Sequence, residues 1–168
     1  PVFQPDVRTF EVSNAKTGEV TGLFYLDTYA RKGKRSGAWA TTYRSRAGLL
    51  GDKIVLGSNN NNFTKPSPGK PVLISLIDAE TLWHEFGHAI HYYLSDVKYP
   101  SLGGSPRDFV EYPSQVKENW LLTRPVLDKF ARHYQSGEAM PAALVQKIEA
   151  SDTFNQGFAT VEYLSSAL

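Results

Sequence analysis

Hydrophobic and polar positions follow a period of two in the first part of the chain, up to about residue 75. Residues 21–31, TGLFYLDTYAR, show this period best, because Phe24 and Leu26 alternate with Tyr25 and Asp27 in a segment rich in aromatic residues. Alternation of this kind is typical of β-strands. Further strands are expected at 38–46, 52–58 and 71–77.

Turn-forming residues indicate how these strands connect. The segment KGKRSG at 32–37 has turn chemistry, so we expect 38–46 to return as the hairpin partner of 21–31. The run NNNNFTKPSPGKP at 59–71 is polar and contains Pro and Gly, which predicts a loop. The strand at 71–77, PVLISLI, is then expected to be buried.

Apolar residues recur every three or four positions from Asp78 onward, which predicts helices. The first is expected at 78–96, with Asp78 as its N-cap. The second is expected at 106–122, opened by Pro106 and kinked at Pro113. Three more are expected at 125–137 closed by Gly137, at 141–151 opened by Pro141, and from 155 onward.

Together these elements predict an α+β fold that is mainly α. Residues 1–75 would form a small β-sheet, and residues 76–168 a helical bundle that carries the segment HEFGHAIH at 84–91. A chain of 168 residues is long enough to bury a core of its own. We therefore expect a single domain over residues 1–168.

Composition and charge narrow the possible partners and sites. A net charge of +1 gives no reason to expect nucleic acid or an anionic membrane as partner. The chain has no cysteine, so a metal would have to be held by His, Asp or Glu. The longest apolar runs fall far short of the roughly 20 residues that a membrane-spanning helix needs. Since the chain begins at Pro1 and ends inside an expected helix, we expect it to be part of a longer protein.

Three of the four histidines lie between residues 84 and 91, in the segment HEFGHAIH. On a helix, His84 and His88 project from one face about one turn apart, so both imidazoles can reach one zinc ion. Glu85 lies beside that ion, where a carboxylate can take a proton from the attacking water. The pattern H-E-x-x-H therefore indicates a catalytic zinc site. The alternative is a polar helix face exposed to solvent.

Two neighbouring residues support the metal interpretation. Glu80 lies four residues before His84 on the same face, where it can accept a hydrogen bond from the non-ligating nitrogen of a metal-bound histidine. It would also suit the first turn of the helix, where negative charge is favoured. Gly87 lies in the middle of the helix, where glycine costs about 1 kcal/mol relative to alanine. That cost is easier to understand if another backbone packs closely against it.

A catalytic zinc needs a third protein ligand and an open position, and four residues are candidates. His91 is nearly a turn away from an ion held by the first two histidines, so we interpret it as structural. His133, in a later amphipathic helix, fits a surface or packing role better. Glu111 would complete a set of two histidines and a glutamate if its helix folds back antiparallel to the first. Asp108, three residues earlier, is the alternative.

The candidate residues belong to longer segments that carry a family resemblance. The segments are GLFYLDTYARKGKRSGAW, NNNNFTKPSPGKPVLISL, ETLWHEFGHAIH, YPSL followed by PRDFVEYPSQ, ARHYQSGEAMP and FNQGFATVEYL. They resemble the thimet oligopeptidase family of zinc metallopeptidases, in particular its bacterial peptidyl-dipeptidase branch, and cover nearly the whole chain in the same order. The resemblance implies a zincin-like fold whose metal site lies deep in a channel that admits short peptides.

The resemblance also implies a role for each candidate residue. His84, His88 and Glu111 match the family's zinc ligands, with one zinc per chain. Glu85 matches its general base, and Glu80 matches a carboxylate that orients a ligand histidine. The family match thus favours Glu111 as the third ligand.

Two departures from the family pattern change what we expect of this chain. Between YPSL and PRDFVE there is only GGS, where the family typically has about two residues more. The short loop at 101–106 could shift Glu111 relative to the histidines. In addition, family members are several times longer, and the N-terminal half that closes the channel and the C-terminal His and Tyr groups that bind substrate have no counterpart here.

The resemblance therefore implies that residues 1–168 are a single, partial catalytic domain, with residues 76–168 as its metal-binding part. We expect this zinc-binding core to hydrolyse peptides feebly or not at all, within a parent protein that releases C-terminal dipeptides from short peptides. A strand edge in this family pairs with the substrate backbone, and residues 21–30 or their hairpin partner are its expected source. The alternatives are an inactive zinc-binding fragment and an endo-acting oligopeptidase of the same family. The expected compartment is the cytoplasm, with the periplasm as the alternative.

Overall fold

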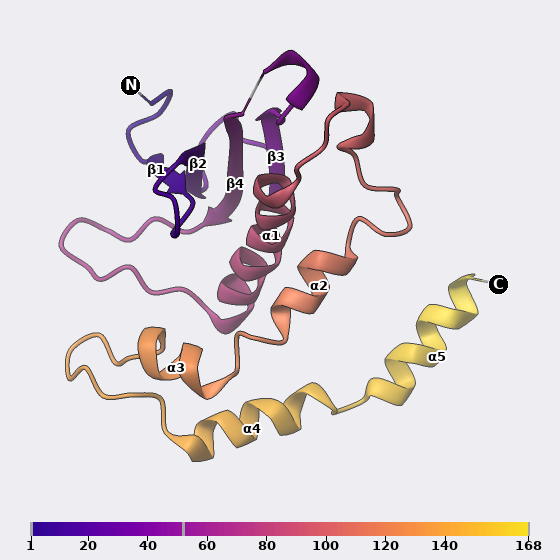
Figure 1. The fold of residues 1–168 in the computed structure, drawn as a ribbon. Coiled ribbons are helices and arrows are strands. Elements are labelled where there is room, and N and C mark those ends of the chain that lie inside the picture. The colour runs from indigo at the N-terminus through magenta and orange to yellow at the C-terminus, as the bar shows by residue number, and fades with distance from the viewer. Residues whose placement is uncertain (1, 52, 168) are drawn as a thin grey trace. The chain divides into compact units, whose positions relative to one another are not determined.

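The structure is a computed structural model that describes residues 2–51 and 53–167. These residues form two compact units, one up to Leu121 and one from Leu122 onward. The first unit contains a four-stranded β-sheet and two helices that follow it in the sequence, and the second contains three further helices (Figure 1). This mixed α/β composition agrees with the coarse fold prediction.

The sheet consists of four strands in the order β1-β2-β4-β3. They are β1 at Arg8–Ser13, β2 at Val20–Tyr29, β3 at Trp39–Arg44 and β4 at Val55–Phe63. β2 pairs antiparallel with β1 and parallel with β4, and β4 pairs antiparallel with β3. The expected hairpin of 21–31 with 38–46 is therefore wrong, because β4 lies between those two strands.

The four consecutive asparagines lie inside β4, so the loop prediction for 59–71 is wrong where it overlaps this strand. The side chain of Asn59 donates from Nδ2 to the carbonyl oxygen of Leu82 at 3.1 Å. Asn60 donates from Nδ2 to the carbonyl oxygen of Trp39, also at 3.1 Å. Asparagine is unfavourable in strands on average, but hydrogen bonds of this kind offset part of the cost of burying it.

The flanks of β4 also differ from the sequence expectation. β4 begins at Val55, so the strand expected at 52–58 is present only in its second half, and Asp52 lies outside the described residues. The strand expected at 71–77 is wrong. The residues before Leu76 have no regular structure, and the apolar side chains there are mostly exposed.

A helix, α1, replaces the end of that expected strand and spans Leu76–Leu94. Its start is fixed by a capping box: Ser75 Oγ accepts a hydrogen bond from the backbone N–H of Asp78 at 3.0 Å, and Asp78 Oδ2 accepts one from the N–H of Ser75 at 3.2 Å. The prediction that Asp78 is the N-cap is therefore wrong, since Ser75 has that position. Two backbone donors are satisfied by side chains only three residues away, and this local preference overrides the strand-like pattern.

One face of α1 packs on the sheet. The buried cluster between them consists of Phe24, Val55, Ala89 and Tyr93. The hydroxyl of Tyr93 donates to the carbonyl oxygen of Leu23 at 2.6 Å. The Tyr93 ring lies directly against Gly22, where a side chain would collide with it, and its hydroxyl lies beside Gly57, where a Cβ atom would be 3.2 Å from it. Burying each large side chain contributes about 1.5–3 kcal/mol, so this cluster holds the helix in place over the sheet.

The second helix of the first unit, α2, spans only Tyr112–Glu118, which is shorter than the helix expected at 106–122. Pro113 lies in its first turn, so the expected kink at this residue is wrong. Proline suits this position because the first turn of a helix leaves its N–H groups unpaired anyway. α2 packs against α1. Two 3₁₀ helices, η1 at Gly48–Leu50 and η2 at Pro100–Leu102, lie in loops.

The second unit begins with α3 at Arg124–Phe130. The helix expected at 125–137 is therefore wrong beyond Phe130. The chain turns back there instead, with the N–H of His133 donating to the carbonyl oxygen of Glu138 at 2.9 Å. Gly137 has a φ of 73°, a left-handed conformation that glycine adopts without steric cost and that closes this turn.

The last two helices agree with the sequence prediction. α4 at Ala142–Asp152 corresponds to the helix expected at 141–151, and Pro141 is its N-cap. α5 at Gln156–Ala167 corresponds to the helix expected from 155 onward, whose final residue, Leu168, lies outside the described residues. In the described part of the chain, no helix is both long and apolar enough to cross a membrane.

Candidate metal centre

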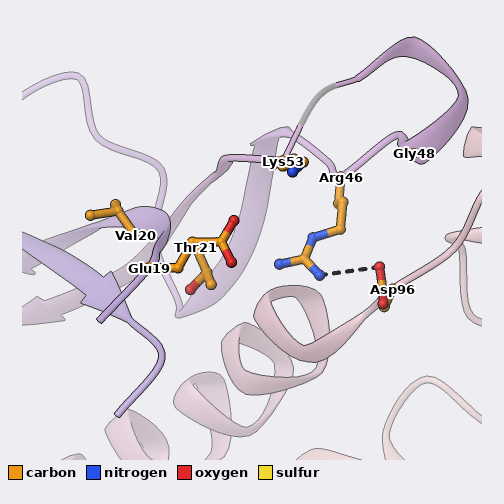
Figure 2. A pocket seen from close by; sticks show the side chains of 7 residues that line it. All are labelled: Glu19, Val20, Thr21, Arg46, Gly48, Lys53 and Asp96. Carbon is orange, nitrogen blue, oxygen red and sulfur yellow. Dashed lines mark hydrogen bonds and ion pairs between the residues drawn. The ribbon is translucent and has the colours of Figure 1, made fainter. Parts of the chain in front are cut away.

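A pocket of about 260 Å³ opens near the C-terminal end of α1 (Figure 2). Two acidic residues, Glu19 and Asp96, and two basic residues, Arg46 and Lys53, contribute to its lining. The guanidinium group of Arg46 turns towards Asp96, with 3.2 Å between Nη1 and Oδ1 (Figure 2). The opposite charges balance one another and none of the four histidines lines this pocket, so we locate the candidate chemistry elsewhere on α1.

His84 and His88 lie one turn apart in α1, and their imidazole rings are neighbours. The two ring centroids are 5.0 Å apart, with an angle of 81° between the ring planes. His88 is buried and His84 is half-buried. The sequence prediction that both rings share one face of the helix therefore describes their arrangement correctly.

Glu111 is the residue directly before α2, and its side chain approaches both histidines. Its Oε2 atom lies 3.1 Å from Nε2 of His84 and 3.2 Å from Nε2 of His88. The short loop at 101–106 thus still brings Glu111 to the histidines.

Two of the separations among the three converging atoms are close to those around a tetrahedral zinc ion. Ligands at about 2.0–2.1 Å from such an ion lie about 3.3–3.4 Å from one another. The separations of 3.1 and 3.2 Å between the carboxylate oxygen and the two nitrogens are close to this spacing. A set of two histidines and one carboxylate also leaves the fourth position open, as catalytic rather than structural zinc sites do.

Gly87 allows α1 and α2 to touch beside this centre. A Cβ atom at residue 87 would lie 2.6 Å from Cα of Ser114 and 3.2 Å from the carbonyl oxygen of Pro113. The expectation that another backbone packs against Gly87 is therefore confirmed. The close approach holds α2 near enough for Glu111 to reach α1.

Glu118, at the end of α2, contacts the centre and was not expected from the sequence. Its Oε1 atom lies 2.5 Å from Nδ1 of His84, on the side of the ring that faces away from Glu111. Glu80, expected to make this contact, is exposed, and no hydrogen bond joins it to His84 in the part of the chain that the structure describes. The only sequence signal for Glu118 is its spacing of seven residues from Glu111, close to two helical turns.

Glu85 is buried beside the two histidines, with an exposed fraction of 8%. Burial raises the pKa of its carboxyl group, and the neighbouring His84 and His88 and a backbone hydrogen bond from Ala40 oppose part of this rise. Ala40 belongs to β3, the last strand of the sheet. The predicted general base therefore lies next to an edge strand.

The other candidate ligands are not part of this group. His91 stacks on Tyr92, with 6.3 Å between the ring centroids and 15° between the planes. His133 accepts a hydrogen bond at Nδ1 from the N–H of Ser136 at 3.2 Å. Asp108 is exposed. Among residues 2–51 and 53–167, one cluster of histidine and carboxylate side chains could hold a metal ion. It consists of His84, His88 and Glu111.

The sequence of this chain is similar to those of known peptidases. The model of peptidase family M3 matches residues 1–168. Dipeptidyl carboxypeptidase of Escherichia coli (strain K12) is 42% identical over 170 residues, which are 100% of this chain and 25% of that protein. Oligopeptidase A of the same organism is 36% identical over 174 residues, covering 99% of this chain and 25% of that protein. The resemblance inferred from the sequence is confirmed, and the chain spans about a quarter of the length of these curated relatives.

Proposed function

Since the chain belongs to peptidase family M3, we propose that it is the zinc-binding core of a peptidase that hydrolyses short oligopeptides. The observation that carries the proposal is the convergence of three ligand atoms, Nε2 of His84, Nε2 of His88 and Oε2 of Glu111. These atoms would hold one zinc ion per chain. The parent protein would use this core to release C-terminal dipeptides.

Glu85 is the proposed general base. His84, His88 and Glu111 would hold the zinc ion, which would supply a Lewis acid that lowers the pKa of a water molecule towards neutrality and polarises the scissile carbonyl group. The carboxylate of Glu85 accepts the proton that the attacking water loses, and then donates it to the leaving amine nitrogen. Burial raises the pKa of Glu85, which suits a group that must both accept and return a proton near neutral pH.

Glu118 is the proposed orienting residue for His84. A carboxylate 2.5 Å from Nδ1 favours the tautomer that carries its proton on this nitrogen. The lone pair of Nε2 is then free to bind the ion, and the ring is held in one orientation. We assign this role to Glu118 rather than to Glu80, because only Glu118 has the contact.

β3 is the proposed binding strand for the substrate backbone. Of the two strands considered from the sequence, β2 is already paired on both sides, with β1 and β4. β3 pairs with β4 alone and ends the sheet, so an extended peptide can add to its free side. Since Ala40 of β3 contacts Glu85, a peptide bound there would lie beside the general base.

The names of the relatives support the proposed product. The dipeptidyl carboxypeptidases of Escherichia coli and Salmonella typhimurium are 42% and 40% identical to this chain, and oligopeptidase A of Escherichia coli is 36% identical. Because an oligopeptidase is among these relatives, the second candidate is an endo-acting oligopeptidase of the same family. We place the parent in the cytoplasm, since one relative is named probable cytosolic oligopeptidase A, with the periplasm as the alternative.

Elemental analysis of the purified chain, combined with a peptide hydrolysis assay, tests this function. We expect about one zinc per chain in the wild type and in Glu85→Gln, and little in His88→Ala, which removes a ligand. Any hydrolysis of short peptides by the wild type should disappear in Glu85→Gln. A wild-type chain without zinc would refute the metal centre. Zinc without hydrolysis would favour the alternative of an inactive zinc-binding fragment.

A further inference from the structure

The carboxylate of Glu111 needs a partner that holds it in place. Its side chain is 52% exposed and belongs to the residue before α2, not to the body of a helix. A mobile glutamate side chain loses rotamer entropy when it is fixed in one orientation. A ligand that is already oriented avoids most of this cost when the metal binds.

Ser114 supplies such a partner. Its hydroxyl donates to the carbonyl oxygen of Glu111 at 2.8 Å and to Oε2 of the same residue at 3.1 Å. This Oε2 is also the atom that faces the imidazole nitrogens of His84 and His88. A hydroxyl carries a single proton, so the proton is shared between the two acceptors and ties the carboxylate to the turn from which it projects.

Ser114 is itself held by α1. It is completely buried, and its backbone lies against Gly87, where a Cβ atom would be 2.6 Å from Cα of Ser114 and 3.2 Å from its N atom. Gly87 directly precedes His88 in α1. The serine hydroxyl therefore has a fixed position relative to the histidines, and the Glu111 carboxylate takes its position from the hydroxyl.

We propose that Ser114 is a positioning residue that pre-orients the Glu111 carboxylate for zinc. This inference rests on the proposed function of the centre. Ser114 would contribute to the zinc affinity through Glu111, without contacting the ion itself. Loss of an orienting partner of a metal ligand typically lowers metal affinity about 10- to 100-fold, and we expect Ser114→Ala to fall in this range.

The test compares Ser114→Ala with Ser151→Ala in the full chain. Ser151 donates to the carbonyl oxygen of Ile148 at 2.7 Å, the same three-residue hydroxyl-to-carbonyl bond, but this bond lies within α4, which belongs to the second unit. Zinc affinity is measured by competition with a chelator. Ser114→Gly, which also lacks the hydroxyl, is the second variant in case the alanine form does not fold.

A second readout separates positioning from folding. Circular dichroism of the metal-free proteins reports whether each variant is folded, and the visible absorption of the cobalt(II) forms reports the ligand geometry. We expect Ser114→Ala to be folded, to lose about 10- to 100-fold in zinc affinity and to show an altered cobalt spectrum, whereas Ser151→Ala matches the wild type.

The outcomes distinguish this inference from the proposed function. If the wild type binds no zinc, the metal centre is refuted, and the role of Ser114 with it. If the wild type binds zinc and a folded Ser114 variant has the same affinity and the same cobalt spectrum, the centre stands and the positioning role is refuted. A Ser114 variant that is less thermally stable, but keeps the zinc affinity and the cobalt spectrum of the wild type, likewise refutes the positioning role.

Discussion

Substitution of Gly87 by alanine would place one methyl group where α1 touches the backbone of α2. The added Cβ would lie 2.6 Å from Cα of Ser114, whereas ordinary contacts begin at 3.4 Å. The neighbour is backbone, so it cannot turn aside as a flexible side chain can. We expect α2 to move away from α1 in Gly87→Ala.

The size of the effect follows from two opposing terms. Alanine is favoured over glycine inside a helix by about 1 kcal/mol, and overpacking a close contact costs about 1–3 kcal/mol. The net loss in free energy of unfolding should therefore be about 0–2 kcal/mol. Restoring an ordinary contact moves Ser114 by about 0.8 Å, and Glu111 with it. Binding sites tolerate about 0.5 Å, so zinc affinity should fall more clearly than stability.

Urea unfolding of the metal-free chain and zinc titration measure the two effects separately. Gly157→Ala is the matched control, because Gly157 also lies in a helix, α5, but has open space around its Cβ position. We expect this control to gain between zero and about 1 kcal/mol and to bind zinc as the wild type does. A Gly87→Ala protein that is more stable than the wild type and keeps its zinc affinity would refute the close contact of α1 with α2.

Two further predictions concern Glu118 and Asp27. Glu118→Gln removes the charge beside Nδ1 of His84, and we expect it to weaken zinc binding about 10-fold or more in a competition with a chelator. The control is Glu80→Gln, at an exposed residue, and it should bind zinc as the wild type does. Burial raises the pKa of Asp27, but hydrogen bonds from Arg31 and Lys34 outweigh burial and hold it below the ordinary value of 3.8. Ionised Asp27 therefore stabilises the fold above about pH 3.8, and this contribution is lost as the pH falls below that value. Urea unfolding between pH 2 and 7 checks this, and an acid-induced loss that is equal in Asp27→Asn would contradict it.

Local sequence was sufficient for several features of this protein. The spacing of His84 and His88 fixes them on one face wherever the segment is helical, because α-helix geometry depends on nothing outside the segment. The helices α4 and α5 were predicted from apolar residues that recur every three or four positions, a pattern that also lies within each segment. The glycine at residue 87 indicated a close backbone contact, since its cost inside a helix requires compensation.

The order of the strands depended on contacts that no local pattern contains. The asparagines of β4 have low strand propensity, yet three of them, Asn59, Asn60 and Asn61, are buried, because β2 and β3 pair with this strand on either side. An alternating pattern shows which face of a strand is apolar, but it does not identify the neighbour. The hairpin expected from the sequence failed for this reason.

The sequence by itself determined the helix of the candidate centre and the shared face of His84 and His88, with the proposed general base Glu85 beside them, because these residues lie within one turn or so of a single helix. Only the tertiary structure decided that Glu111 meets the histidines, that Glu118 rather than Glu80 contacts His84, and that the hydroxyl of Ser114 reaches the Glu111 carboxylate. These contacts join two helices, and their distances are set by how closely the backbones pack at Gly87.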